Sequence, residues 1–182
     1  IGGSVIYAVA RGERDDVKAA NGYFTSAFIL GTLWALILWV LVWVCEEPLL
    51  RLFGANDALM PLCKEYMVAP KLTVPVYVFI NLLSSFLRND GDPGRATKAV
   101  IFGGIFNVFG DYFFVFTLDM GIKGAGIATA MGASMSVLVM LTHFISKKNT
   151  LKFVKPLRIL NSFKMISVNG FSSFIVDVAM GI

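Results

Sequence analysis

One polar pair inside a long apolar run is the part of this sequence whose residue types could do chemistry. Asp111 interrupts the run from Ala99 to Leu118, and Asn107 lies four residues before it. Residues four apart share one face of an α-helix, so we expect the carboxylate and the amide to project together. An ionised carboxylate in hydrocarbon is costly, and acids in such runs therefore mark sites for ions, protons or substrates. A purely structural hydrogen bond is the alternative interpretation of Asp111.

The elements that must hold this pair are membrane-spanning helices. Hydrophobic residues make up 57% of the 182-residue chain, charged residues only 15%, and the mean hydropathy is +0.73. These values are typical of polytopic membrane proteins. We predict an all-α polytopic membrane protein whose spans cover residues 24–45, 58–87, 99–118 and 124–146, with a last span beginning near Met165. Runs of about 20 residues cross a hydrocarbon core of roughly 30 Å.

The second of these spans is the least apolar and contains three prolines. Proline lacks the backbone N–H that a helix interior requires, so it kinks the helix. We therefore predict a bend between Pro70 and Pro75. Residues 46–57, which precede this span, are predicted to form a loop.

The connections between spans differ in charge. Twelve of the sixteen Lys and Arg residues fall in three loops, residues 11–22, 88–98 and 147–164, whereas loops 46–57 and 119–123 hold one each. The positive-inside rule places the three basic loops in the cytoplasm of a cell-membrane protein. The distribution of the charges behind the formal net charge of +4 therefore indicates how the protein is oriented in the membrane. We expect no nucleic-acid partner. A lipid-binding patch is the alternative for one basic run, namely Lys147, Lys148, Lys152, Lys155 and Arg158.

A third polar residue, Thr129, is expected at the same depth in the membrane as Asp111. Asp111 lies roughly 21 Å from the cytoplasmic end of its span, and Thr129 roughly 8 Å below the outer edge of the next. In a core of roughly 30 Å the two levels coincide. Asn107, Asp111 and Thr129 could then offer three oxygens to Na⁺ or a proton, although Thr129 could instead bond its own helix. Small residues form a stripe for close helix contact on this span, namely Gly124, Ala128, Gly132 and Ser136.

Two further polar residues lie within apolar runs. Asp177 falls in the last span, roughly 15 to 18 Å from its start, and is a second candidate cation or proton ligand. His143 lies near the cytoplasmic end of its span, where we expect a lone interfacial residue.

Four stretches of the chain, taken in order, resemble the multidrug and toxic compound extrusion (MATE) transporters. They read IGGSVIYAVARGERDD, LLRLFGAND, RNDGDPGRATKAVIFGGIFNVFGDYFFVF and MGIKGAGIATAMG. The resemblance implies twelve helices in two six-helix lobes and efflux of drugs or metabolites coupled to Na⁺ or H⁺. On that alignment the chain holds helices two to six of the first lobe and the start of helix seven. Residues 1–146 then belong to the first lobe, residues 147–164 connect the lobes, and residues 165–182 begin the second.

The resemblance also assigns roles to individual residues. Asn107, Asp111 and Thr129 match positions implicated in the first-lobe cation or proton site, with Asp111 and Asn107 as Na⁺ candidates. Asp177 matches a helix-seven position that is acidic in members with a second-lobe site. Many members have proline directly after the helix-five aspartate, whereas this chain has Tyr112.

Two transporter hypotheses and one enzyme hypothesis remain in competition, and a third class, a passive membrane scaffold, would leave Asp111 unexplained. The leading hypothesis is a secondary multidrug transporter that is not an enzyme, has no cofactor beyond its coupling ion, and works as a monomer with a drug-like substrate. No G-x-x-x-x-G-K-[ST] motif for ATP binding is present. A lipid-linked-precursor flippase of the same superfamily is the runner-up, although such proteins favour a basic cavity. An intramembrane aspartyl protease would need a second carboxylate beside Asp111.

Overall fold

The structure, a computed structural model, describes residues 2–12, 16–156 and 159–180. Regular structure within these ranges is helical throughout. The elements are α1 (Gly2–Gly12), α2 (Val17–Val44), α3 (Glu46–Leu52), α4 (Met60–Tyr66), α5 (Val68–Asn89), α6 (Pro93–Asp111), the π-helix η1 (Tyr112–Thr117), α7 (Gly121–Leu141), the 3₁₀-helix η2 (Thr142–Ile145) and α8 (Ile159–Met180).

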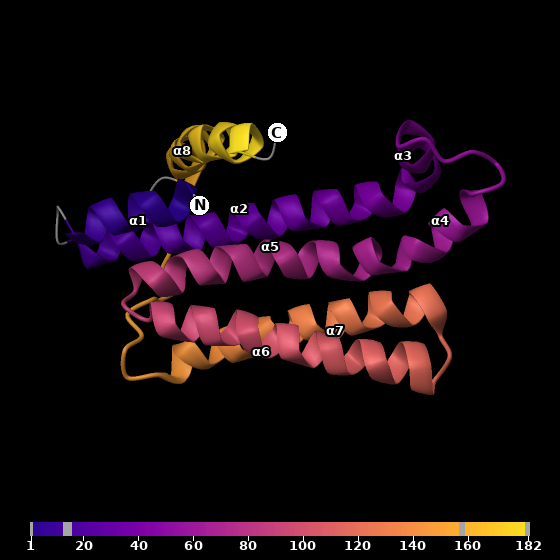
Figure 1. The fold of residues 1–182 in the computed structure, drawn as a ribbon. Helices are drawn as coiled ribbons and strands as arrows, with labels where there is room; N and C mark the ends of the chain where they lie inside the picture. Colours follow the sequence, from indigo (N-terminus) through magenta and orange to yellow (C-terminus); the bar gives the residue numbers. More distant parts are fainter. Residues whose placement is uncertain (1, 13–15, 157–158, 181–182) are drawn as a thin grey trace.

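Long helices lying side by side form the body of the molecule (Figure 1). Four stretches of the described chain are long and apolar enough to cross a membrane, and they match the four complete spans predicted. These stretches are Val17–Val44, Met60–Asn89, Pro93–Thr117 and Gly121–Ile145. The helix α1 lies along the start of α2, while α8 crosses over both and is seen nearly end-on in Figure 1. The crossing is close, because a Cβ on Gly2 would collide with the backbone of Gly170 and Ile166.

The helix α2 begins seven residues earlier than the apolar run alone indicates. Asp16 stands at its N-cap, and the Asp16 carboxylate accepts a hydrogen bond from the Ala19 N–H at 2.9 Å. Such a cap satisfies one of the unpaired amides at a helix start. The polar residues from 17 to 22 are therefore the first turns of the spanning helix.

The second span is interrupted earlier than the prolines suggested. Helical structure breaks at Met67, and hydrogen bonding then continues through α5 with Pro75 inside the helix. Pro70 occupies the third position of α5, where its missing N–H would have had no partner within the helix. The predicted loop 46–57 also contains the short helix α3, whose first turn carries Glu46 and Glu47.

The turn between α5 and α6 is much shorter than the predicted loop 88–98. It consists of residues 90–92, where Gly91 adopts a φ of +82° that other L-residues rarely reach. Pro93 then opens α6 at the position where a helix tolerates proline best. Aromatic side chains fill the core at this end of the bundle, and the ring centroids of Phe24 and Phe86 lie 5.0 Å apart.

The connector between α7 and α8 is an extended strap held to α2. The Lys152 N–H donates to the Asn21 side chain at 2.8 Å, and the Val154 N–H donates to the Thr25 hydroxyl at 3.0 Å. The helix α8 begins at Ile159, six residues before the predicted start near Met165. Arg158, the last member of the basic run, lies outside the described residues.

Candidate functional site

The predicted site lies where α6 and α7 approach most closely. A Cβ on Gly132 would lie 2.6 Å from the Gly103 carbonyl oxygen and 2.7 Å from the Asn107 Cβ, which no real side chain tolerates. A Cβ on Gly103 would collide with Ser136 and with the Gly132 carbonyl. The stripe of small residues predicted on this span is buried in the contact, namely Gly124, Ala128, Gly132 and Ser136.

Asn107 and Thr129 meet across this contact, one helical turn from Asp111, the residue whose depth was predicted to match that of Thr129. The Asn107 amide nitrogen donates to the Thr129 hydroxyl at 3.4 Å. The Thr129 hydroxyl also donates to the Ala125 carbonyl at 2.9 Å, which is the bond within its own helix that the sequence left open. The two residues line a cavity of about 190 Å³ whose other walls include Tyr77 and Ile80 of α5.

Asp111 lies one helical turn farther along α6, at the last residue before the π-helix η1. Its Oδ1 atom is buried and has no hydrogen-bond partner among the residues that the structure describes. Buried polar atoms are almost always paired, so an orphaned carboxylate oxygen calls for a proton or a cation. The structure therefore pairs Asn107 with Thr129 and leaves Asp111 beside them, without a hydrogen bond to either.

The oxygen atoms of Asn107, Thr129 and Asp111 are of kinds that hard cations bind. The Asn107 amide nitrogen is used toward Thr129, so its carbonyl oxygen stays available as a ligand. The Thr129 oxygen, which accepts one hydrogen bond and donates another, keeps one lone pair. Hard cations such as Na⁺ take oxygen ligands of these kinds. Within the described ranges no three His, Cys, Asp or Glu residues gather as a metal-binding group.

The second predicted acid, Asp177, lies in the helix α8, but its side chain falls outside the described residues. Its part in a cation or proton site therefore stays a prediction.

His143 is fully buried between two carboxylates, so the expectation of a lone interfacial residue was wrong. Its Nε2 lies 2.7 Å from the Asp90 Oδ2, and its Nδ1 lies 3.3 Å from the Asp92 Oδ2. The imidazole ring therefore lies between two carboxylates, with one ring nitrogen within hydrogen-bond distance of each.

Asp90 is the centre of a larger network that joins four segments of the chain. Its carboxylate accepts hydrogen bonds from the Tyr7 hydroxyl at 3.0 Å, from the Thr150 N–H at 2.9 Å and from the Thr150 hydroxyl. Burial raises the pKa of Asp90, but the hydrogen bonds from Thr150, His143 and Tyr7 outweigh burial and hold the pKa below its ordinary value.

The pKa of Asp92 is likewise lowered. Burial raises it, and the hydrogen bonds from Arg95 and His143 lower it by more. Sequence reasoning missed this network because its members stand more than 50 residues apart, as His143 does from Asp90 and Asp92. The sequence held one signal for this network. Two aspartates lie in one turn, and the single histidine of a later span lies at the same end of the bundle.

Comparison with known proteins gives consistent matches. The MatE family profile matches residues 1–113. The multidrug export protein MepA of Staphylococcus saprophyticus is 24% identical to this chain, over the whole chain and 41% of MepA. A probable multidrug resistance protein of Bacillus subtilis, YpnP, is 24% identical over 74% of the chain and 30% of that protein. The chain thus spans less than half the length of these relatives.

Solved structures give the same match in three dimensions. An inward-facing MATE family transporter of the MOP superfamily superposes with a TM-score of 0.85, over 94% of this chain and 39% of that one, at 24% identity. A MATE structure in the bent conformation superposes with a TM-score of 0.83, over 98% of this chain and 41% of that one. The arrangement of α1 to α8 is therefore that of part of such a fold.

Proposed function

Because the chain belongs to the MatE family, we propose that it forms part of a secondary active multidrug efflux transporter. The protein would export organic, often cationic, compounds in exchange for Na⁺ or H⁺ by alternating access. Its relatives are transporters and not enzymes, and MepA, named a multidrug export protein, suggests the substrate class. The proposal includes a monomeric full-length protein with its three basic loops in the cytoplasm, where the positive-inside rule places them.

The observation that carries this proposal is the orphaned oxygen of Asp111. Its Oδ1 is buried without a partner, one turn from the paired Asn107 and Thr129. A bound Na⁺ or proton would offset the cost of burying this carboxylate. Losing the ion would leave the charge uncompensated and favour a conformation that admits water or a new ion. Among the described residues no second carboxylate lies within hydrogen-bond distance of this oxygen, as an aspartyl protease would require.

The test is the variant Asp111→Asn in the full-length protein. This change preserves side-chain shape but removes the titratable charge, so coupled export should be lost while expression and thermal stability stay near the wild-type values. The assay is ion-driven export of a cationic dye from membrane vesicles, with Na⁺ gradients and pH gradients applied separately. Wild-type export by Asp111→Asn under both gradients would contradict the proposal.

A matched control makes the same chemical change at an exposed place. Asp119, in the short turn before α7, is exposed and has a φ of +51°, a conformation that asparagine tolerates well. Asp119→Asn should therefore export dye at the wild-type rate. Asp177→Asn separates the two candidate sites, because it abolishes coupling only if the acid on α8 binds the coupling ion.

A further inference from the structure

The proline inside α5 leaves one backbone carbonyl of that helix without its ordinary partner. In an α-helix the N–H of each residue bonds to the carbonyl four residues before it. Pro75 has no N–H, so the carbonyl of Lys71 receives no such bond. Both residues lie in a stretch that is long and apolar enough to cross a membrane, where lipid cannot supply the missing donor. The Lys71 carbonyl therefore needs a donor from another part of the protein.

The indole of Trp39 on α2 supplies this donor. Its Nε1 donates to the Lys71 carbonyl oxygen at 2.7 Å. Tryptophan has one N–H and no acceptor, so its indole can serve such a carbonyl without needing a further partner. The hydrogen bond joins α2 to α5 at the carbonyl that Pro75 releases.

Two further contacts hold the same lysine to the same side of α2. The Lys71 Nζ lies 2.7 Å from the Glu46 carboxylate, with the two side chains only 15% and 20% exposed. The same Nζ lies 4.6 Å from the centroid of the Trp43 ring, in a cation–π contact. Trp39, Trp43 and Glu46 follow one another at intervals of four and three residues, which keeps side chains on one side of a helical chain. We call these three residues, together with Lys71, the Trp39 clamp.

The other side of α5 borders the candidate cation site. In Figure 1, α5 lies between α2 on one side and α6 and α7 on the other. A cavity of about 600 Å³ lies between α5 and α7, and its α5 wall includes Thr73 and Tyr77, which stand on either side of Pro75 in the sequence. Thr129, which bonds to Asn107, is part of the α7 wall. The angle of α5 at Pro75 therefore sets the width of the space beside Thr129.

We propose that the Trp39 clamp is a positioning device for the coupling site, an inference that rests on the transport function proposed above. By satisfying the Lys71 carbonyl, Trp39 fixes the angle of α5 at Pro75 and with it the position of Tyr77. Tyr77 also lines the smaller cavity that contains Asn107 and Thr129. Helices bend at proline, so α5 would take several angles without the indole donor. Ligands whose surroundings shift bind a cation less tightly, so Trp39 acts through α5 and does not touch the ion.

A double-mutant cycle tests whether the indole replaces the missing backbone donor. Trp39→Phe keeps an aromatic ring but removes the N–H, so it should lower the unfolding temperature of the purified full-length protein by a few degrees. Pro75→Ala restores a backbone N–H that can bond to the Lys71 carbonyl. In the Pro75→Ala background, Trp39→Phe should therefore lower the unfolding temperature very little.

The matched control for this cycle is Trp34→Phe. Trp34 also lies on α2, is 53% exposed, and has no hydrogen bond from its indole to a described residue. Its replacement should have the same small effect with and without Pro75. An equal loss from Trp39→Phe in both backgrounds would overturn the assignment of the indole as the donor.

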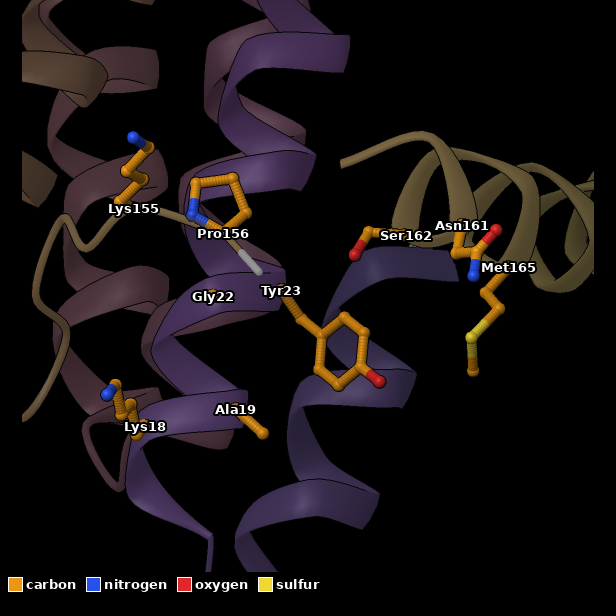
Figure 2. A pocket seen from close by; sticks show the side chains of 9 residues that line it. All are labelled: Lys18, Ala19, Gly22, Tyr23, Lys155, Pro156, Asn161, Ser162 and Met165. Carbon is orange, nitrogen blue, oxygen red and sulfur yellow. The ribbon is translucent and has the colours of Figure 1, made fainter. Parts of the chain in front are cut away.

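Ion-driven export of a cationic dye by the full-length protein tests the positioning role. Trp39→Phe should raise the Na⁺ or proton concentration for half-maximal export several-fold, because the ligand oxygens are less well placed. A purely structural role would reduce the amount of folded transporter, and so the maximal rate, without this shift. Tyr23→Phe is the control, because it removes an aromatic donor near the other end of α2, at a cavity that Lys155 and Met165 also line (Figure 2). It should keep the wild-type half-maximal concentration.

The outcomes separate this inference from the transport function itself. An unchanged half-maximal concentration in Trp39→Phe would overturn the positioning role. Absence of ion-driven export by the wild type would instead contradict the transport function. The unfolding cycle needs no transport, so it would still decide whether Trp39 replaces the donor that Pro75 lacks.

Discussion

At the scale of single residues, the chain treats its buried carboxylates in opposite ways. Asp90 receives hydrogen bonds from three residues, whereas the Oδ1 of Asp111 receives none among the described residues. A fully satisfied carboxylate stabilises one arrangement of its neighbours, while an unsatisfied one is poised to bind something. The difference separates a structural acid at the end of the bundle from the acid that we propose binds the coupling ion.

The first prediction concerns the histidine between the two aspartates. His143→Ala would remove a hydrogen-bond partner that the buried carboxylates of Asp90 and Asp92 share, so it should lower the free energy of unfolding by about 1 to 3 kcal/mol. Thermal unfolding of the purified full-length protein measures this loss. Lys147→Ala is the control, because Lys147 lies four residues after His143 and is exposed. Equal stability of the two variants would show that the network contributes little.

The second prediction is a loss of stability in acid. The pKa values of Asp90 and Asp92 are lowered in the folded protein from an ordinary value of 3.8. Each carboxylate therefore contributes stability that is nearly complete above about pH 5, where the unfolded chain is also ionised, and that declines as the pH falls through the folded pKa. Asp90→Asn should flatten the acid side of a plot of unfolding temperature against pH. The exposed carboxylate of Asp57 offers a control, and Asp57→Asn should keep the wild-type slope.

At the scale of helices, α6 and α7 pack so closely that a Cβ on Gly103 or Gly132 would collide with the other helix. Gly103 and Gly104 are neighbours in the sequence, but only a Cβ on Gly103 meets other atoms, while a Cβ on Gly104 meets none within 4 Å. The third prediction follows from this difference. Gly103→Ala should destabilise the protein by about 1 to 3 kcal/mol through overpacking, and Gly104→Ala should not. The measurement is the unfolding temperature of each variant, which should fall for Gly103→Ala and not for Gly104→Ala.

Features of the helices could be predicted from the sequence where one physical requirement alone determines them. Runs of about 20 apolar residues must span the membrane, and the small-residue stripe ending at Ser136 had to face a helix, so both were predicted correctly. The predicted helix ends were wrong because capping residues, and not composition, decide where these helices begin. Asp16 and Pro93 begin helices inside segments that composition marks as loops.

The candidate site was predictable for a similar reason, and only in part. Helical rise alone placed Asp111 and Thr129 at one depth, whereas Thr129 touches Asn107, one turn before Asp111. Rise does not reveal which polar side chains converge when loops fold back. The environment of His143 depends on Asp90 and Asp92 arriving from another turn, which no local pattern encodes.

At the scale of the whole molecule, charge is divided between the two ends of the bundle. At the end opposite the basic loops, cations are paired, as Lys71 is with Glu46 at 2.7 Å and Lys64 with Glu47 at 3.0 Å. The excess of cations at the basic end is what the positive-inside rule recognises.

The fourth prediction tests this orientation by labelling single cysteines in intact cells. With Cys45 and Cys63 replaced by serine in the full-length protein, Gly12→Cys and Lys148→Cys should resist a membrane-impermeant thiol reagent, and Ala58→Cys should react. All three positions are exposed, so differences in labelling report the side of the membrane. Labelling of Gly12→Cys and Lys148→Cys, with protection of Ala58→Cys, would mean the opposite orientation.

The π-helix after Asp111 has a consequence for how this span tolerates changes in length. The Leu118 N–H bonds to the Phe113 carbonyl, five residues back, so η1 fits one more residue into its turn than an α-helix would. Deleting one residue between Phe113 and Phe116 would let the turn close as an α-helix while Gly121 and all that follows stay in place. The same deletion within α6 would rotate Asn107 away from Thr129 by about 100°. The span therefore has one place where its sequence can shorten without disturbing the polar pair.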